Sequence, residues 1–145
     1  MALQIGDKAP LTKGIDQNGN VYDFSNKKII LYFYPKDDTS GCTAQACNLN
    51  ENLPAIAQAG YEVIGVSIDS EKAHQKFIKK YDLKFNLIAD ENKEMVEAYQ
   101  VWVEKSMYGK TYMGTARTTF VIEENGIISN IVSKVETKNH ANQLL

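Results

Sequence analysis

The sequence predicts an α/β fold in which helices flank a central mixed β-sheet. Short apolar runs of strand length alternate with segments of helical periodicity, which is typical of parallel strands joined by helices. The last two apolar runs flank the Asn125-Gly126 pair, a signal for an antiparallel hairpin. The chain has 145 residues without repeats or a linker-like tract, so we expect one domain over residues 1–145.

The expected elements follow from these patterns. The run 28–34 ends at Pro35 and has the continuous apolar character of a buried strand. Pro54 lies inside a helical pattern, where it predicts either a kink or a restart with the proline in the first turn. Strands are expected at 28–34, 62–68, 85–88, 118–122 and 127–132, and helices at 42–59, 70–81 and 92–100. A thioredoxin-like arrangement satisfies this order, as do other small α/β folds.

Composition narrows the function classes. The formal net charge of −2 argues against a general nucleic-acid-binding role, which needs a basic surface. The apolar runs are all far shorter than the ~20 residues of a membrane-spanning helix, so no membrane partner is expected. Residues 1–7 lack the basic start and apolar core of a signal peptide, and we therefore expect a cytoplasmic protein.

The two cysteines, Cys42 and Cys47, are five positions apart. They would close a very small loop, which is a poor structural staple. In a reducing cytoplasm such a pair is more often catalytic or metal-binding than structural. The two histidines, His74 and His140, lack metal-motif spacing to either cysteine, so no metal site is expected.

Cys42 follows a buried strand and a polar loop, and falls at the start of a predicted helix. The partial positive charge of a helix N-terminus favours the thiolate, and the N–H groups of the first turn can bind an anionic sulfur or a peroxide oxygen. Thr39 and Ser40 are candidate helix caps. The surrounding Gly, Ser, Thr and Asp residues argue against deep burial, and therefore against a purely structural cysteine.

The pattern Pro-x-x-x-Thr-x-x-Cys, formed by Pro35, Thr39 and Cys42, resembles the active-site signature of peroxiredoxins. The wider run 34–43 resembles the peroxiredoxin Q group, also called bacterioferritin comigratory proteins. The segments 6–10, 16–19, 65–67 and 116–122 resemble other parts of the same group. The resemblance covers nearly the whole chain and implies a thioredoxin-like fold with no cofactor.

The resemblance also implies a role for each matching residue. Cys42 would be the peroxidatic cysteine and Cys47 the resolving cysteine of an intramolecular disulfide. Thr39 would direct its hydroxyl at the peroxide, Pro35 would shield the thiolate from water, and Arg117 would stabilise negative charge. The implied enzyme is a thiol-dependent peroxidase for hydrogen peroxide and organic hydroperoxides. It would be recycled by thioredoxin or a similar dithiol protein, and would be a monomer or weak dimer.

This sequence departs from the group in three places. The group usually has proline at the position of Ser40 and glutamate at the position of Gln45, so we expect a looser loop and a lost carboxylate contact. The last helix, ending at 142–145, is expected to be short.

Other polar and aromatic residues have simpler interpretations. His74 is expected to be solvated, and Asp37 and Asp38 to be loop charges rather than a catalytic pair. Trp102, Tyr99, Tyr108 and Tyr112 are expected in the core or at its rim.

Two other function classes remain open from the sequence. A general thiol–disulfide oxidoreductase is disfavoured, because that chemistry usually rests on Cys-x-x-Cys and four residues separate Cys42 from Cys47. The other alternative is a non-enzymatic module whose cysteine pair senses redox state. One assay distinguishes the three classes. A peroxidase consumes peroxide with a dithiol, an oxidoreductase reduces insulin without peroxide, and a sensor does neither.

A helix that carries both cysteines also predicts motion. Five helical steps would hold the Cα atoms of Cys42 and Cys47 about 8.6 Å apart. A disulfide usually needs Cα atoms within about 4.4–6.8 Å. The sequence therefore predicts that the first turns of the helix unwind when the disulfide forms.

Overall fold

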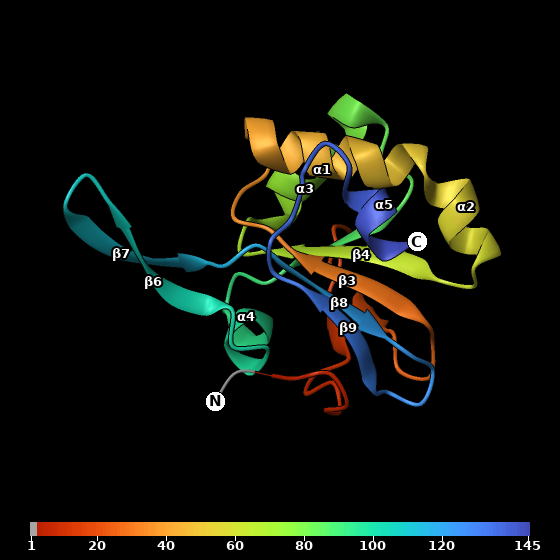
Figure 1. The fold of residues 1–145 in the computed structure, drawn as a ribbon. Helices are drawn as coiled ribbons and strands as arrows, with labels where there is room; N and C mark the ends of the chain where they lie inside the picture. Colours follow the sequence, from red (N-terminus) through yellow and green to blue (C-terminus); the bar gives the residue numbers. More distant parts are fainter. Residues whose placement is uncertain (1–2) are drawn as a thin grey trace.

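The computed structural model describes residues 3–145 and contains a central five-stranded sheet in the order β5-β4-β3-β8-β9 (Figure 1). Its strands are β3 (Ile29–Phe33), β4 (Glu62–Ser67), β5 (Asn86–Ala89), β8 (Thr118–Ile122) and β9 (Ile128–Val132). Strands β3, β4 and β5 are parallel, whereas β8 is antiparallel to both β3 and β9. The predicted mixed sheet is confirmed.

The remaining elements surround this sheet. The helices are α1 (Ser40–Glu51), α2 (Leu53–Gln58), α3 (Glu71–Tyr81), α4 (Glu94–Ala98) and α5 (His140–Leu144). Strands β1 (Lys13–Ile15) and β2 (Val21–Asp23) form one small antiparallel sheet, and β6 (Trp102–Met107) and β7 (Lys110–Thr115) form another. The sequence patterns predicted neither of these two hairpins. No helix within residues 3–145 is long and apolar enough to cross a bilayer.

Both faces of the sheet are covered by apolar side chains. Ile29, Leu31 and Phe33 of β3 pack on one face against a cluster that includes residues of α4. The alternate residues of β3 point to the other face, because successive side chains of a strand alternate. That second face is covered by α1, α2, α3 and α5 (Figure 1). Cys42 belongs to the cluster on this second face, so the site lies in the layer between the sheet and these helices.

Pro54 divides the predicted helix 42–59 into two. Helix α1 ends at Glu51, and α2 begins at Leu53 with Pro54 in its first turn. Proline has no N–H to donate to the carbonyl of Asn50, and it is well tolerated where a first-turn N–H has no helical acceptor. The restart, rather than a kink, is confirmed.

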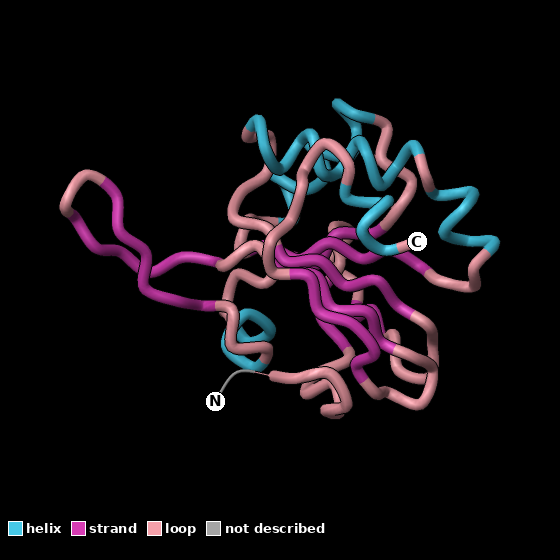
Figure 2. The backbone as a smooth tube through the Cα atoms, viewed as in Figure 1, coloured by secondary structure: helices cyan, strands magenta, loops and turns pink. Residues whose placement is uncertain are grey.

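The β6–β7 hairpin projects away from the body of the molecule, as the ribbon and the backbone tube both show (Figures 1 and 2). The expectation that its tyrosines lie in the core or at its rim is wrong. Tyr108 at the tip is 97% exposed, and Tyr112 is also exposed. Tyr99, by contrast, is buried, and its hydroxyl donates to the carbonyl oxygen of Leu11 at 2.7 Å.

Candidate functional site

The sheet topology brings Arg117 to Cys42. Phe33 at the end of β3 pairs with Thr118 at the start of antiparallel β8. Arg117, which precedes Thr118, therefore lies at the same sheet edge as the loop that leads from β3 into α1. Nη2 of Arg117 is 3.3 Å from Sγ of Cys42. The contact joins the expected peroxidatic cysteine to the arginine that is expected to stabilise negative charge.

Cys42 is buried, with 1% of its surface exposed. The expectation that a loop rich in small polar residues keeps it accessible is wrong for this conformation. The thiol packs among buried residues such as Tyr34 and Ala46, and the guanidinium of Arg117 covers it. A purely structural cysteine has no need of a cation in contact with its sulfur. A guanidinium there stabilises the thiolate rather than the thiol.

Thr39 stands at the N-cap position of α1 but does not cap the helix with its side chain. Its hydroxyl donates to the carbonyl oxygen of Lys36 at 2.9 Å, and its own carbonyl accepts the N–H of Thr43 at 2.8 Å. Ser40 is the first helical residue rather than the cap. The predicted side-chain cap is therefore wrong, whereas the position of Cys42 in the first turn is confirmed. The N–H groups of Ser40, Gly41 and Cys42 precede the first helical hydrogen bond, which the N–H of Thr43 makes.

Gln45 is fully buried and touches Arg117. Its Oε1 accepts a hydrogen bond from Nη1 of Arg117 at 2.7 Å. A carboxylate is absent from this position, as the sequence indicates, yet the amide oxygen still orients the guanidinium. The amide Nε2 has no partner within residues 3–145. Because an amide oxygen carries no net charge, the positive charge of Arg117 remains available to the thiolate.

Lys105 of β6 adds positive charge that the sequence analysis missed. Burial lowers its pKa, and the nearby guanidinium of Arg117 lowers it further. The middle of the projecting hairpin therefore lies within electrostatic range of Arg117. The sequence of β6 does not alternate apolar and polar residues, so it carried no strand signal.

Cys47 lies on the same helix as Cys42, and both thiols are free. Cys47 is partly exposed, and its pKa is raised by burial and by the carboxylate of Glu51. An intact helix keeps the two Cα atoms about 8.6 Å apart, too far for a disulfide. The structure therefore shows the geometry from which the predicted unwinding would start.

His74 of α3 forms a buried pair with Asp37, which lies in the same loop as Pro35 and Thr39. The expectation of a solvated histidine is wrong, because His74 is fully buried. Its Nδ1 is 2.6 Å from Oδ2 of Asp37, and its Nε2 is 2.8 Å from the carbonyl oxygen of Ile88. A carbonyl oxygen can only accept, so Nε2 carries a hydrogen.

Asp37 is held from two further directions, and so is not a solvated loop charge. Tyr34 donates its hydroxyl to Oδ1 of Asp37, and the backbone N–H of Asp37 donates to Asp69. Contacts from Tyr34, Asp69 and His74 thus fix the loop between β3 and α1. One signal was present in the sequence: His74 shares the helical face of Phe77, three positions further on.

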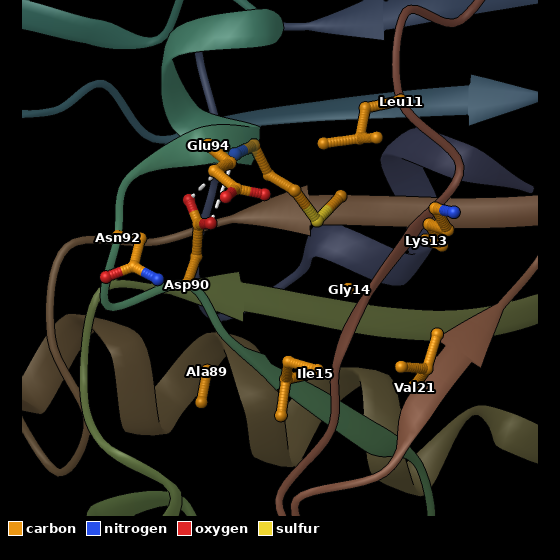
Figure 3. A pocket seen from close by; sticks show the side chains of 10 residues that line it. Leu11, Lys13, Gly14, Ile15, Val21, Ala89, Asp90, Asn92 and Glu94 are labelled. Atoms are coloured by element: carbon orange, nitrogen blue, oxygen red, sulfur yellow. Dashed lines mark hydrogen bonds between the residues drawn. The ribbon is translucent and has the colours of Figure 1, made fainter.

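A pocket of about 300 Å³ lies on the other side of the sheet from Cys42, between β1, β2 and α4 (Figure 3). Asp90 at its wall accepts N–H bonds from Met95 and Val96, so its carboxylate caps α4. Burial raises the pKa of Asp90 despite these bonds. The pocket contains none of the predicted site residues. Over residues 3–145, no group of three His, Cys, Asp or Glu side chains is arranged to hold a metal ion.

Comparison with known proteins agrees with this geometry. Residues 5–131 match the AhpC/TSA family. The chain is 43% identical to a putative peroxiredoxin bcp of Coxiella burnetii, covering 100% of this chain and 98% of that one. It is 40% identical to peroxiredoxin Bcp of Escherichia coli, covering 99% and 94% of the two chains.

Solved structures give the same result. A PrxQ mutant from Xylella fastidiosa superposes with a TM-score of 0.91 at 30% identity, covering 99% of this chain and 94% of that one. Peroxiredoxin Q of Xanthomonas campestris superposes with a TM-score of 0.86 at 32% identity, covering 98% and 92%. The chain therefore belongs to the AhpC/TSA family, and within it to the peroxiredoxin Q group, also called Bcp. Peroxiredoxins are thiol-dependent peroxidases, and the thioredoxin-like fold expected for them is confirmed.

Proposed function

We propose that Cys42 is the peroxidatic cysteine of this peroxidase. Its thiolate attacks the terminal oxygen of a peroxide, so that an S–O bond forms while the O–O bond breaks. The leaving alkoxide or hydroxide takes a proton and departs as alcohol or water, and Cys42 becomes a sulfenic acid. The observation that carries this proposal is the 3.3 Å contact between Nη2 of Arg117 and the Cys42 sulfur in the first turn of α1.

Three further residues would assist the attack. Arg117 stabilises the thiolate and the charge that develops on the leaving oxygen. The hydroxyl of Thr39, which now donates to the carbonyl oxygen of Lys36, would leave that bond and donate to a bound peroxide. Pro35 covers the loop and limits the access of water. The hydrogen bonds that hold Asp37 support this assignment, because they fix the loop that carries Pro35 and Thr39.

Cys47 would then resolve the sulfenic acid. Its thiolate attacks the Cys42 sulfur, an S–S bond forms, and the sulfenic oxygen leaves as water. A dithiol protein such as thioredoxin reduces the disulfide and is itself oxidised to a disulfide. This reductant implies a reducing compartment such as the cytoplasm. A monomer or weak dimer remains a prediction.

The proposed substrates are hydrogen peroxide and organic hydroperoxides. A bacterioferritin comigratory protein of Xanthomonas campestris, 31% identical to this chain, is described as having alkyl peroxide reduction activity. That relative supports the organic substrates.

The test is peroxide consumption in the presence of thioredoxin and thioredoxin reductase. Cys42→Ser should abolish turnover, because a hydroxyl is a far weaker nucleophile than a thiolate at neutral pH. Cys47→Ser is the matched control, which should still consume one equivalent of peroxide. Circular dichroism confirms that both variants are folded. Substantial turnover by folded Cys42→Ser would overturn the assignment, and insulin reduction without peroxide would favour an oxidoreductase instead.

A further inference from the structure

Asn48, the residue directly after Cys47, ties helix α1 to the C-terminal segment. Its Oδ1 accepts the backbone N–H of Ala141 at 2.8 Å, and its Nδ2 donates to the carbonyl oxygen of Lys138 at 3.1 Å. Both atoms of the amide are thus used. Both partners are backbone groups, so the tie depends on the position of the segment rather than on its side chains.

The C-terminal segment is itself fixed to the body of the protein. Ala141 in the first turn of α5 is buried in the cluster that contains Ala46 and Leu49 of α1. The ring of His140 joins Oγ1 of Thr119 at 2.8 Å to Oε1 of Gln143 at 2.7 Å. Because Thr119 belongs to β8, the segment is held on the central sheet. Asn48 therefore connects the residue beside Cys47 to a rigid anchor.

This tie opposes the movement that disulfide formation requires. On intact α1 the Cα atoms of Cys42 and Cys47 are about 8.6 Å apart, and a disulfide needs them within about 6.8 Å. Cys47 can approach Cys42 only if the helix around it unwinds. The next residue, Asn48, must then leave its position and lose both hydrogen bonds. The free energy needed to break these two bonds adds to the barrier to disulfide formation. The first attack on peroxide does not require them to break and is unaffected.

We propose that Asn48 is a positioning residue that retains Cys47 in α1, slows resolution and so prolongs the lifetime of the Cys42 sulfenic acid. The proposal rests on the roles proposed above for the two cysteines. Two reactions compete for the sulfenic acid. Attack by Cys47 forms the S–S bond and releases water. Alternatively, the sulfenate sulfur attacks a second peroxide, whose O–O bond breaks to give a sulfinic acid and an alcohol or water. Asn48 shifts this competition toward the second reaction.

The test variant is Asn48→Ser, because serine has a helix propensity close to that of asparagine but is too short to make both bonds. The full-length protein is mixed with hydrogen peroxide, quenched at intervals, and analysed by mass spectrometry for sulfenic acid, disulfide and sulfinic acid. The rate of the first oxidation should stay within about twofold of wild type. Disulfide formation should be roughly fivefold faster, since two hydrogen bonds no longer oppose it. The sulfinic product per peroxide consumed should fall.

Two further variants separate positioning from general destabilisation. Asn142→Ser makes the same exchange on α5, where the amide donates to Oδ1 of Asn139, and should match wild type. Asn48→Asp retains an acceptor for Ala141 but loses the donor to Lys138, and should give an intermediate rate. A merely structural role would lower stability without changing the ratio of disulfide to sulfinic acid.

Two outcomes would contradict the proposal in different ways. In the first outcome, Asn48→Ser is oxidised at the normal rate but forms the disulfide no faster than wild type. This result would overturn the role of Asn48 and leave the peroxidase assignment intact. Peroxide consumption by wild type without any Cys42–Cys47 disulfide would instead refute the resolving role of Cys47, and the role of Asn48 with it. Circular dichroism shows whether Asn48→Ser is folded. If Asn48→Ser unfolds, the rate of disulfide formation in Asn48→Asp is compared with wild type instead.

Discussion

Nη2 of Arg117 lies 3.3 Å from Sγ of Cys42, although the two residues are 75 positions apart in the chain. The contact depends on the pairing of β3 with β8, and the amide oxygen of Gln45 orients the guanidinium from its other side. A cation held in this position stabilises a thiolate in a site that is otherwise shielded from water.

Arg117→Met should remove a donor that stabilises the charge developing on the leaving oxygen, so the rate constant with peroxide should fall by about 100-fold or more. Stopped-flow oxidation in a Cys47→Ser background measures this rate constant. A rate constant equal to that of the Cys47→Ser parent would remove Arg117 from the site.

Oxidation should open helix α1. The Cys42–Cys47 disulfide cannot form on an intact helix, so the oxidised protein should lose helical circular dichroism and exchange amides faster between Thr43 and Leu53. If the Asn48 bonds break at the same time, the amide of Ala141 should also exchange faster. Hydrogen-exchange mass spectrometry of the two redox forms measures this. Identical exchange maps would refute the unwinding mechanism, though not the peroxidase activity.

Disulfide formation should accelerate with rising pH. Burial, and then the carboxylate of Glu51, raise the pKa of Cys47 above its ordinary value, so little reactive thiolate is present at neutral pH. Glu51→Gln removes the second contribution, lowers the pKa of Cys47 and should speed resolution at pH 7. Quenched-flow measurement of the disulfide tests this, with Glu124→Gln as an exposed control. Equal rates for wild type and Glu51→Gln would show that Glu51 does not act on Cys47.

His74→Ala should destabilise the fold by about 3 kcal/mol, because it removes one partner of a buried pair and leaves Oδ2 of Asp37 without its histidine. The loop with Pro35 and Thr39 should also loosen, so the rate with peroxide should fall. Urea unfolding measures the free energy of unfolding, and Lys76→Ala on the exposed face of α3 serves as the control. A loss below about 1 kcal/mol would contradict the structural role of the pair.

Stability should fall as the pH is lowered below about 6.5. Burial lowers the pKa of His140 in the folded protein. The positive charge of Arg117 lowers it further, and the hydrogen bond to Gln143 raises it in part. Below the unfolded pKa the unfolded chain binds a proton that the native protein does not, so the free energy of unfolding decreases until the folded pKa is reached. His140→Gln should flatten this dependence between pH 5 and 6.5. Parallel unfolding curves for both proteins across this range would exclude His140 as its source.

The local features of the site were predictable from neighbouring residues. The apolar run ending at Pro35 and the polar loop after it place Cys42 at a helix start, and Pro54 interrupts the helix at the expected place. The Pro35–Thr39–Cys42 pattern indicated the peroxiredoxin family because its residues lie close together in the sequence, within a single strand–loop–helix unit. Intrinsic preferences of this kind depend on residues a few positions apart and can be recognised without tertiary contacts.

The tertiary structure decided the contacts between distant segments. Packing buried His74 against Asp37, 37 positions away, although the charged residues around it suggested solvent. It also joined Asn48 to Ala141, 93 positions further along the chain. The register of β3 and β8 placed Arg117 on the sulfur of Cys42. What the sequence by itself determined is the position of Cys42 at a helix start, after a buried strand and a polar loop. Which charges surround that cysteine, and what restrains Cys47, depends on burial and strand pairing, and these form only when the whole sheet assembles.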